Sequence, residues 1–217
     1  MRATWVFFDL NGTLLDPSTI AEPLGAAPGV GAELLDLAVW QAMAGTMAGV
    51  YRPLSEYMRA AIEQRVELDG LERGAIDAAL EKSSAMPAFP EAPRALDRLA
   101  AAGLRVGVLS NSPTGAAEHA LHCAGLRERV ELVTGSDEVE VFKPSQALYA
   151  RGLERAGVQA QDVVMVAAHW WDVLGAARAG MSTGWVSRRE GALLGPVPDP
   201  HFRGSDLDEV AEQITGA

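Results

Sequence analysis

The sequence has little of the material that several classes of protein require. Cys123 is the single cysteine among 217 residues, so an internal disulfide and a cysteine-rich zinc site are both excluded, and a reducing, cytoplasmic environment is expected. Lys and Arg together number 18 against 29 Asp and Glu, which gives a formal net charge of −11. No broad basic face remains to neutralise a phosphate backbone, so we expect no nucleic acid partner.

Long apolar runs are also missing. No stretch reaches the roughly 20 uncharged apolar residues that a membrane helix needs, so no membrane association is expected. The N-terminal apolar run is interrupted by Asp9 and lacks a small-residue cleavage site, which argues against a signal peptide. Apolar residues nevertheless make up 48% of the chain and charged residues 22%, which is enough for a well-packed core and excludes intrinsic disorder.

Short apolar runs, each followed by a turn and a helical pattern, recur along the chain. This alternation is typical of βαβ units and predicts an α/β fold with a parallel sheet. Glycines follow most of the predicted helices at the position of a C-cap. The predicted strands cover 5–10, 104–109, 130–134, 163–167 and 183–186, and the predicted helices cover 92–102, 114–124, 145–156 and 171–179.

About ninety residues between the first two predicted strands have helical patterns, at 33–47, 53–67 and 74–84. Three prolines within residues 86–93 then end the helical pattern. We therefore predict an inserted helical cap at 17–88 and a core domain formed by 1–16 and 89–217. Ligands of open parallel sheets bind beyond the carboxyl ends of the strands, so an insertion that leaves the end of the first strand would cover that site as a lid.

Polar side chains stand in four segments where predicted strands end: Asp9-Leu-Asn-Gly-Thr13, Ser110-Asn111, Lys143-Pro144 after the strand-like run EVEVF, and His169-Trp-Trp-Asp172. In their order and positions, with a cap after the first, these segments resemble the haloacid dehalogenase (HAD) superfamily of aspartate-nucleophile hydrolases. The resemblance covers nearly the whole chain and implies that superfamily's Rossmann-like parallel sheet core. FFDLNGTLLD, VLSNS, VFKPSQALYARGLERAGV and VAAHWWDVLGAARAGM look most like the type II 2-haloacid dehalogenases, whose cap is a helical insertion in this place.

Asp9 is the candidate nucleophile. A carboxylate at the mouth of a sheet can present an oxygen to an electrophile, and the resemblance assigns to Asp9 the attack that forms an ester, which water then hydrolyses. Lys143 can pair with Asp9 and with a substrate carboxylate, and this pairing would keep Asp9 ionised. Thr13 supplies a hydroxyl on the same loop, or only caps the turn. Leu10 lies between these groups and is expected to line the substrate site.

Asp172 offers a second carboxylate that could activate the water which attacks the ester, a role that the resemblance supports. Its alternative use is a magnesium site with Asp9 and the Asn11 carbonyl, as in HAD phosphatases. His169 and Trp171 flank Asp172 and are expected to line the pocket, or to serve in capping and core packing. We favour the metal-free reading and expect no cofactor.

The residue at position 11 distinguishes phosphate ester hydrolysis from halide displacement within the superfamily. HAD phosphatases generally carry a second Asp there, which protonates the leaving oxygen of a phosphate ester, whereas an amide has no such proton to give. A halide departs as a stable anion and needs no acid. Ser110 and Asn111, together with nearby backbone N–H groups, could hold a substrate carboxylate through neutral hydrogen bonds.

The predicted cap supplies two further candidates, Trp40 and Tyr51, which could contact the leaving group or serve as ordinary core aromatics. Related dehalogenases usually carry an Arg early in the cap that helps to receive the halide, but residues 31–40 contain none. Taken as a whole, the resemblance implies a hydrolase that converts a 2-haloacid into a 2-hydroxy acid, and the missing Arg would permit a different leaving group. Azetidine-2-carboxylate hydrolysis, a magnesium-dependent phosphatase and an inactive HAD-fold binding protein are the alternatives. A homodimer is left open, because dehalogenases of this branch are often dimers.

Overall fold

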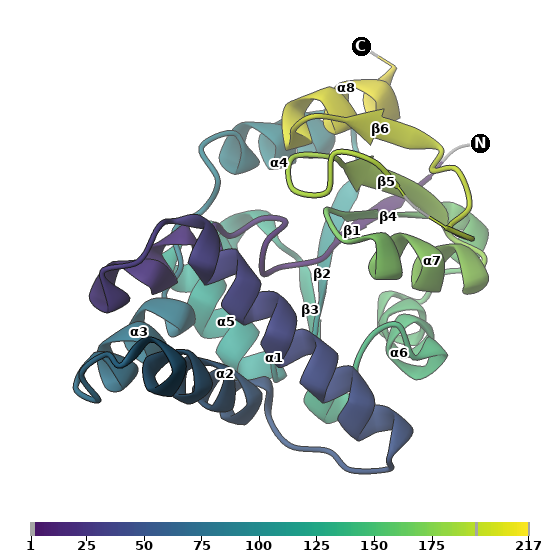
Figure 1. Ribbon diagram of the computed structural model, residues 1–217. Helices are drawn as coiled ribbons and strands as arrows, with labels where there is room; N and C mark the ends of the chain where they lie inside the picture. Colours follow the sequence, from purple (N-terminus) through teal and green to yellow (C-terminus); the bar gives the residue numbers. More distant parts are fainter. Residues whose placement is uncertain (1–2, 194, 217) are drawn as a thin grey trace.

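A single parallel sheet forms the centre of the molecule. The computed structural model describes residues 3–193 and 195–216. Its six strands lie in the order β3-β2-β1-β4-β5-β6, and every neighbouring pair is parallel (Figure 1). The α/β class and the parallel sheet predicted from the sequence are confirmed. The strands are β1 (Trp5–Phe8), β2 (Arg105–Ser110), β3 (Leu132–Gly135), β4 (Val163–Ala167), β5 (Ser182–Val186) and β6 (Phe202–Gly204).

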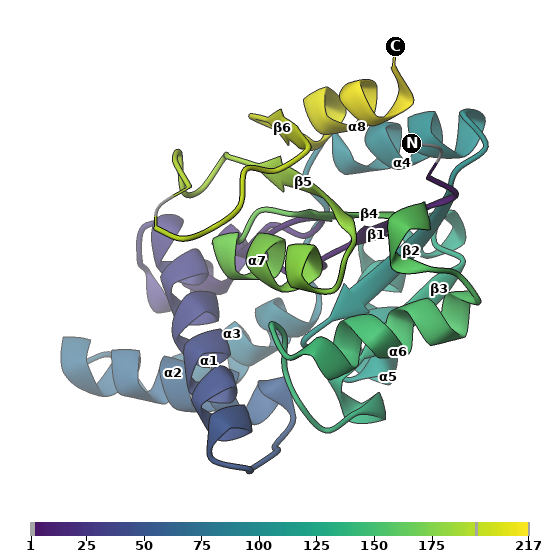
Figure 2. The same cartoon turned by 90° about the vertical axis from the view of Figure 1, so that its right-hand side faces the viewer.

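Helices cover both faces of the sheet, as the edge-on view in Figure 2 shows. Successive residues of β1 point to opposite faces, so Val6 and Phe8 belong to the core cluster that includes Leu96 of α4, while Trp5 and Phe7 belong to the cluster that includes Tyr149 of α6. The helices of this part of the chain are α4 (Ala92–Ala101), α5 (Thr114–Cys123), α6 (Gln146–Ala156), α7 (Trp170–Arg178) and α8 (Leu207–Thr215), with short 3₁₀ helices at Arg127–Arg129, Ser136–Glu138 and Ala160–Asp162.

The segment between β1 and α4 is helical. It contains a 3₁₀ helix (Pro17–Leu24), α1 (Gly29–Met47), α2 (Leu54–Asp69) and α3 (Ala75–Ser84), and Figure 1 shows these three α-helices together on one side of the sheet, away from α8. Leu34 and Leu35 of α1 lie in the same buried cluster as Leu10 and Leu14 of the loop after β1. The apolar core is thus continuous across residue 17, and the domain boundaries at 17 and 88 stay a prediction.

Three contacts attach this helical segment to the carboxyl edge of the sheet. The hydroxyls of Tyr51 and Ser136 are 3.1 Å apart, and Ser136 directly follows β3. The backbone N–H of Phe142 donates to the Thr46 hydroxyl at 3.1 Å, and Arg189, which follows β5, pairs with Asp36 of α1. The helices of 17–84 therefore lie at the end of the sheet where β1 delivers Asp9.

The strand-like run EVEVF is not a strand, which corrects one prediction. Strand β3 ends at Gly135, and residues 138–142 form a 3₁₀ end, a turn and a loop. Glu140 has a φ of 52°, a left-handed conformation that interrupts an extended chain whatever its pattern of alternation. Lys143 reaches the edge of the sheet from this loop instead of from the end of a strand.

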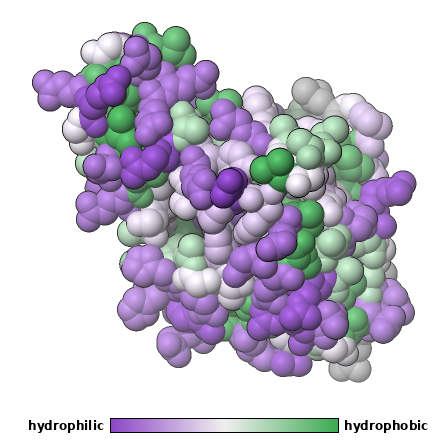
Figure 3. All heavy atoms as spheres, turned by 90° about the horizontal axis from the view of Figure 1, so that it is seen from below, coloured by the Kyte–Doolittle hydropathy of each residue, from purple (hydrophilic) through white to green (hydrophobic). Residues whose placement is uncertain are grey.

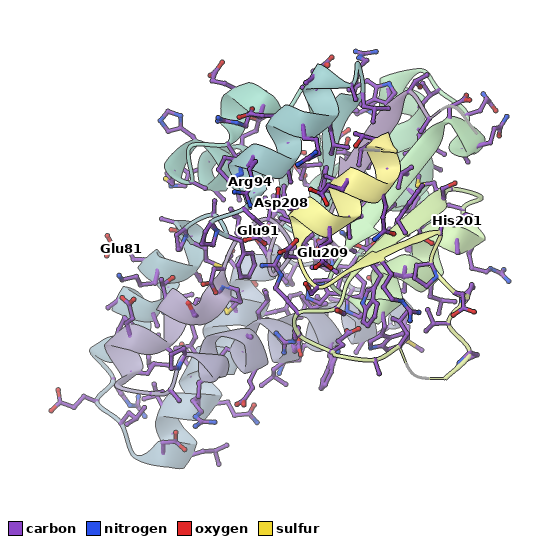
Figure 4. The ribbon with its side chains drawn as sticks, turned by 90° about the horizontal axis from the view of Figure 1, so that it is seen from above. Glu81, Glu91, Arg94, His201, Asp208 and Glu209 are labelled. Atoms are coloured by element: carbon purple, nitrogen blue, oxygen red, sulfur yellow. The ribbon has the colours of Figure 1, made fainter. Side chains whose placement is uncertain are left out.

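Two elements near the C-terminus were not predicted. Strand β6 has three residues, too few for a periodic signal, and α8 begins at the N-cap Asp206, whose side chain accepts the Glu209 N–H. Figure 4 shows Arg94 of α4 beside Asp208 of α8, and these two side chains form an ion pair. Asp208 is buried, while most of the Arg94 side chain is exposed. Buried apolar residues of both helices, such as Leu96 and Val210, pack in the same core cluster.

One face of the molecule is largely polar. Figure 3, which looks at the molecule from below, shows hydrophilic residues over most of that face, with apolar patches between them. Within the described ranges, no helix combines the length and the apolar character needed to cross a bilayer.

Candidate active site

Asp9 stands where β1 ends, in a loop that the backbone folds tightly. The Leu10 carbonyl accepts the N–H groups of Leu14 and Leu15 at 2.9 and 3.0 Å, and Gly12 has a φ of 83°, which a glycine adopts without strain. A Cβ atom on Gly12 would lie 3.0 Å from the His169 ring. This loop turns the Thr13 hydroxyl back toward Asp9, where it donates to Oδ2 at 2.8 Å.

Lys143 joins the two candidate carboxylates. Its ammonium donates to Asp9 Oδ1 at 2.8 Å, to Asp172 Oδ2 at 2.6 Å and to the Leu109 carbonyl at 2.7 Å. The side chain is fully buried. An ammonium has three N–H bonds, so all of its donors are occupied, and Lys143 has none left for the substrate carboxylate that the sequence analysis assigned to it.

Asp172 is held on both oxygens. It lies in the first turn of α7 and is fully buried, with Lys143 on Oδ2 and the Tyr149 hydroxyl on Oδ1 at 2.6 Å. Tyr149 of α6 was not predicted as a site residue, because the sequence around it reads as an ordinary amphipathic helix. Its place depends on Gly175, where a Cβ atom would lie 2.3 Å from the Tyr149 hydroxyl oxygen.

His169 contacts the candidate nucleophile directly. Its Nδ1 lies 3.0 Å from Asp9 Oδ2, and its ring stacks on Trp171 with centroids 4.9 Å apart. Both rings are buried. The sequence analysis left two roles open for these residues, lining the pocket or capping and core packing. In the structure His169 contacts Asp9, and the buried Trp171 supports its ring.

The charges of the cluster determine the protonation of each group. Burial alone would raise the pKa of Asp9, but the Lys143 ammonium and the His169 hydrogen bond hold that pKa below its usual range. Burial and the neighbouring Asp9 raise the pKa of Asp172 in spite of Lys143. Burial would lower the pKa of Lys143, yet the two carboxylates raise it. These opposing effects leave the Asp9 carboxylate ionised, as a nucleophile must be.

Ser110 and Asn111 stand where β2 ends, at the same edge of the sheet. Ser110 Oγ accepts the Ser112 N–H at 3.0 Å, and Asn111 Oδ1 accepts the backbone N–H of Lys143 at 2.8 Å. The Asn111 Nδ2 is buried and has no hydrogen-bond partner within the described part of the chain. A buried amide donor without a partner costs free energy, so this group is available to an acceptor on a ligand.

The Asn11 side chain contacts the loop after β2, where its Nδ2 donates to Ser112 Oγ at 3.1 Å. Both residues line a cleft of about 550 Å³ whose other lining residues come mostly from α2, α3 and α5. Leu54 and Met58 of α2 contribute apolar surface to the same cleft. This cleft therefore reaches the loop that carries Asp9 through Asn11, and its lining combines apolar side chains with charged ones such as Arg59 and Glu63.

The two aromatic candidates of the helical segment differ in their surroundings. The buried face of α1 is formed by residues such as Leu35, Ala38 and Val39, and Trp40 falls outside it with a 55% exposed side chain. None of the interactions in the described residues links Trp40 to the cluster, so the structure does not bring it to the site. Tyr51 packs at 5.3 Å against Phe142, the neighbour of Lys143, and so supports the loop that carries the lysine.

The donor set does not suit a magnesium ion. Within the described residues, no group of three or more His, Cys, Asp or Glu could hold a metal. The Lys143 ammonium already lies between Asp9 and Asp172, and every oxygen of the two carboxylates accepts a hydrogen bond. Magnesium prefers six oxygen ligands, which these groups do not present.

Comparison with known proteins gives a consistent result. A family model described as haloacid dehalogenase-like hydrolase matches residues 4–180. Haloacetate dehalogenase H-2 of Moraxella sp. (strain B) is 27% identical and covers 89% of this chain and 91% of its own length. (S)-2-haloacid dehalogenase 1 of Pseudomonas sp. (strain CBS-3) is 29% identical and covers 83% of both.

Solved structures agree with the sequence comparison. The L-2-haloacid dehalogenase RSc1362 superposes with a TM-score of 0.91 over 100% of both chains at 27% identity. The L-2-haloacid dehalogenase of Xanthobacter autotrophicus with chloropropionic acid covalently bound gives a TM-score of 0.86 over 99% of both chains; at 22% identity it supports the fold alone. The predicted resemblance is confirmed, and this chain is an enzyme that belongs to the haloacid dehalogenase-like hydrolases, with L-2-haloacid dehalogenases, the type II branch, among its relatives.

Proposed function

We propose that this enzyme displaces the leaving group at C2 of a small 2-substituted carboxylic acid and converts a 2-haloacid into a 2-hydroxy acid. The observation that carries the proposal is the buried Asp9, ionised beside Lys143 and next to a second carboxylate, Asp172. Relatives along most of the chain are haloacid dehalogenases, and one structural neighbour carries chloropropionic acid in covalent linkage.

The first step would be substitution at C2. An oxygen of Asp9 attacks C2 from the side opposite the halogen, the C–halogen bond breaks, and the halide leaves with the bonding electron pair. No proton is transferred, which fits a site in which Asn11 offers no acid. The Asn111 Nδ2, a buried donor without a partner among the described residues, would bind the substrate carboxylate.

The second step would be hydrolysis of the ester. Water attacks the Asp9 Cγ, and Asp172 accepts its proton; the raised pKa of Asp172, caused by burial and by Asp9, suits a base. The bond between Cγ and the ester oxygen then breaks, and the 2-hydroxy acid takes up the proton. Tyr149 and Lys143 would hold Asp172 in place for this transfer.

The function is tested by a product panel. Both enantiomers of 2-chloropropionate, chloroacetate, azetidine-2-carboxylate and a phosphate monoester are incubated with the enzyme, and halide, ring-opened amine and phosphate are measured. We expect equimolar halide and 2-hydroxy acid. Release of the ring-opened amine alone would mean that Asp9 is still the nucleophile but that the bond it breaks is a strained C–N bond and not a C–halogen bond. Release of phosphate alone would refute the proposal.

We expect catalysis to need no metal, because Lys143 supplies the positive charge between the carboxylates. Treatment with EDTA followed by gel filtration should leave the rate of halide release within about 20% of the untreated enzyme, since no step of carboxylate displacement requires a Lewis acid. Activity that disappears with EDTA and returns with magnesium would instead favour the phosphatase alternative.

Residues 17–88 would act as a cap over this site. The support is the set of contacts through Tyr51, Thr46 and Asp36, all of which reach the carboxyl edge of the sheet. A cytoplasmic location is proposed from the single cysteine, Cys123, alone. The homodimer that the resemblance leaves open is measured by light scattering after gel filtration.

A further inference from the structure

The two oxygens of Asp9 have different numbers of partners. A carboxylate oxygen has two lone pairs that can accept hydrogen bonds. Oδ2 faces two groups, the Thr13 hydroxyl at 2.8 Å and His169 Nδ1 at 3.0 Å, so both of its lone pairs are occupied. Among the residues that the structure describes, Oδ1 accepts one hydrogen bond, from Lys143 at 2.8 Å. Oδ1 therefore keeps one lone pair for attack on carbon, and Oδ2 does not.

The hydrogen on His169 follows from the same geometry. An ionised carboxylate oxygen can only accept, so the Nδ1 that faces Oδ2 must carry its proton, either in the neutral Nδ1–H form or in the imidazolium. Stacking on Trp171 and the close approach of Gly12 fix the plane of the ring. His169 is thus a pre-positioned donor to Oδ2 in both of its protonation states.

We propose that Oδ1 is the alkylated oxygen of Asp9 and that His169 and Thr13 together form an oxyanion hole for Oδ2 during hydrolysis of the ester. The inference rests on the proposed function, because it needs an ester on Asp9. It gives His169 a catalytic role that lining a substrate pocket would not require.

Hydrolysis of the ester moves electrons between the two oxygens of Asp9 and moves protons through Asp172. After alkylation Oδ1 is the ester oxygen and Oδ2 is the carbonyl oxygen. Water forms a bond to Cγ and gives a proton to Asp172, while the π electrons of the carbonyl move onto Oδ2, where the two donors stabilise the negative charge. The carbonyl then re-forms, the Cγ–Oδ1 bond breaks, and the departing alkoxide takes the proton from Asp172. The new acid on Asp9 releases its own proton to solvent.

Several charged groups surround the His169 ring. Burial lowers its pKa, but the hydrogen bond and charge of Asp9 raise it, as do the charges of Asp36 on α1 and Asp172 on α7. Glu190, which accepts the Trp170 N–H, also interacts with it. Arg189 and Lys143 offset part of this negative charge. Because the neutral Nδ1–H form also donates to Oδ2, loss of the imidazolium charge leaves the hydrogen bond intact.

The test separates the two chemical steps. Enzyme in excess is mixed with 2-chloropropionate, and mass spectrometry of the quenched protein follows the covalent adduct. In His169→Phe, which keeps a ring against Trp171 but has no donor, we expect the rate constant of ester hydrolysis to fall about 100- to 1000-fold, the usual effect of removing one oxyanion donor. Ester formation should stay within about tenfold of the wild type, so the adduct accumulates.

Two further variants serve as controls. His169→Asn places an amide N–H near the position of Nδ1, and its ester hydrolysis should return to within about tenfold of the wild type. His122→Phe makes the same substitution at an exposed histidine of α5 and should change neither step. Circular dichroism melts of all variants show whether the fold is kept.

The outcomes are distinct. Accumulation of adduct in His169→Phe with rescue in His169→Asn supports the proposal. If formation slows as much as hydrolysis in His169→Phe, or if no adduct accumulates while the wild type still releases halide, His169 only holds the nucleophile and the oxyanion assignment is overturned. If the wild type itself forms no adduct and releases no halide, the proposed function fails, and this inference fails with it.

Discussion

Asp9→Asn is expected to abolish turnover while the protein stays folded. The amide is nearly isosteric with the carboxylate but is a far poorer nucleophile, and loss of a nucleophile that acts within such a cluster typically lowers kcat by about 10⁴-fold or more. Folding should survive because Lys143 keeps Asp172 as a charged partner at 2.6 Å. The Thr13 hydroxyl can rotate to accept from the new amide.

The measurement is halide release by Asp9→Asn and by Asp16→Asn, together with thermal melts. Asp16 lies on the same loop and accepts the Ser18 N–H as an N-cap, which an asparagine also does, so this control should keep its activity. Activity within tenfold of the wild type in Asp9→Asn would show that another group attacks the substrate.

A labelling experiment tests the same step in the wild type. A single turnover in heavy-oxygen water should leave the label in Asp9, because water attacks the Asp9 Cγ and the product takes its oxygen from the carboxylate. Label found in the product after the first turnover would mean that water attacks C2 directly. Asp9 would then act as a general base, and the covalent mechanism would be wrong.

The sequence predicted the sheet and the four loops because both depend on local chemistry. Apolar runs separated by turns predict parallel strands, and polar residues at strand ends must meet at one edge. Asp9, Lys143 and Asp172 were therefore expected together before any distance was known. Even so, Lys143 was placed for a reason that proved wrong, since the run EVEVF before it is interrupted by the left-handed Glu140.

What the sequence could not predict depends on side-chain directions across the fold. Tyr149 reaches Asp172 because Gly175 on the neighbouring helix has no side chain to block it. The sequence around either residue gives no sign that the two helices approach each other at this point. Trp40 was a candidate from its position in the predicted cap, but the helical phase of α1 turns it to the surface. The orientation of His169 toward Asp9 depends equally on Trp171 beneath its ring.

Lys143→Met is expected to have the second large effect. Two buried carboxylates would then share the site without a cation, and breaking a buried ion pair on one side typically costs about 3–5 kcal/mol. The pKa of Asp9 should rise, because burial and Asp172 both favour the protonated form once the ammonium is gone. We expect ester formation near pH 7 to slow by about 1000-fold, since a protonated carboxyl is a poor nucleophile.

The pH profile distinguishes loss of charge from loss of packing. In the wild type, Asp9 is held ionised well below its usual pKa, so ester formation should not change between about pH 5 and pH 8. In Lys143→Met the rate of ester formation should increase with pH over this range, as Asp9 loses its proton. Lys82→Met is the matched control, because Lys82 is the other lysine of the chain and pairs with Glu22 at the surface. A variant at position 143 with a flat profile and an adduct formed at the wild-type rate would show that the ammonium does not control Asp9.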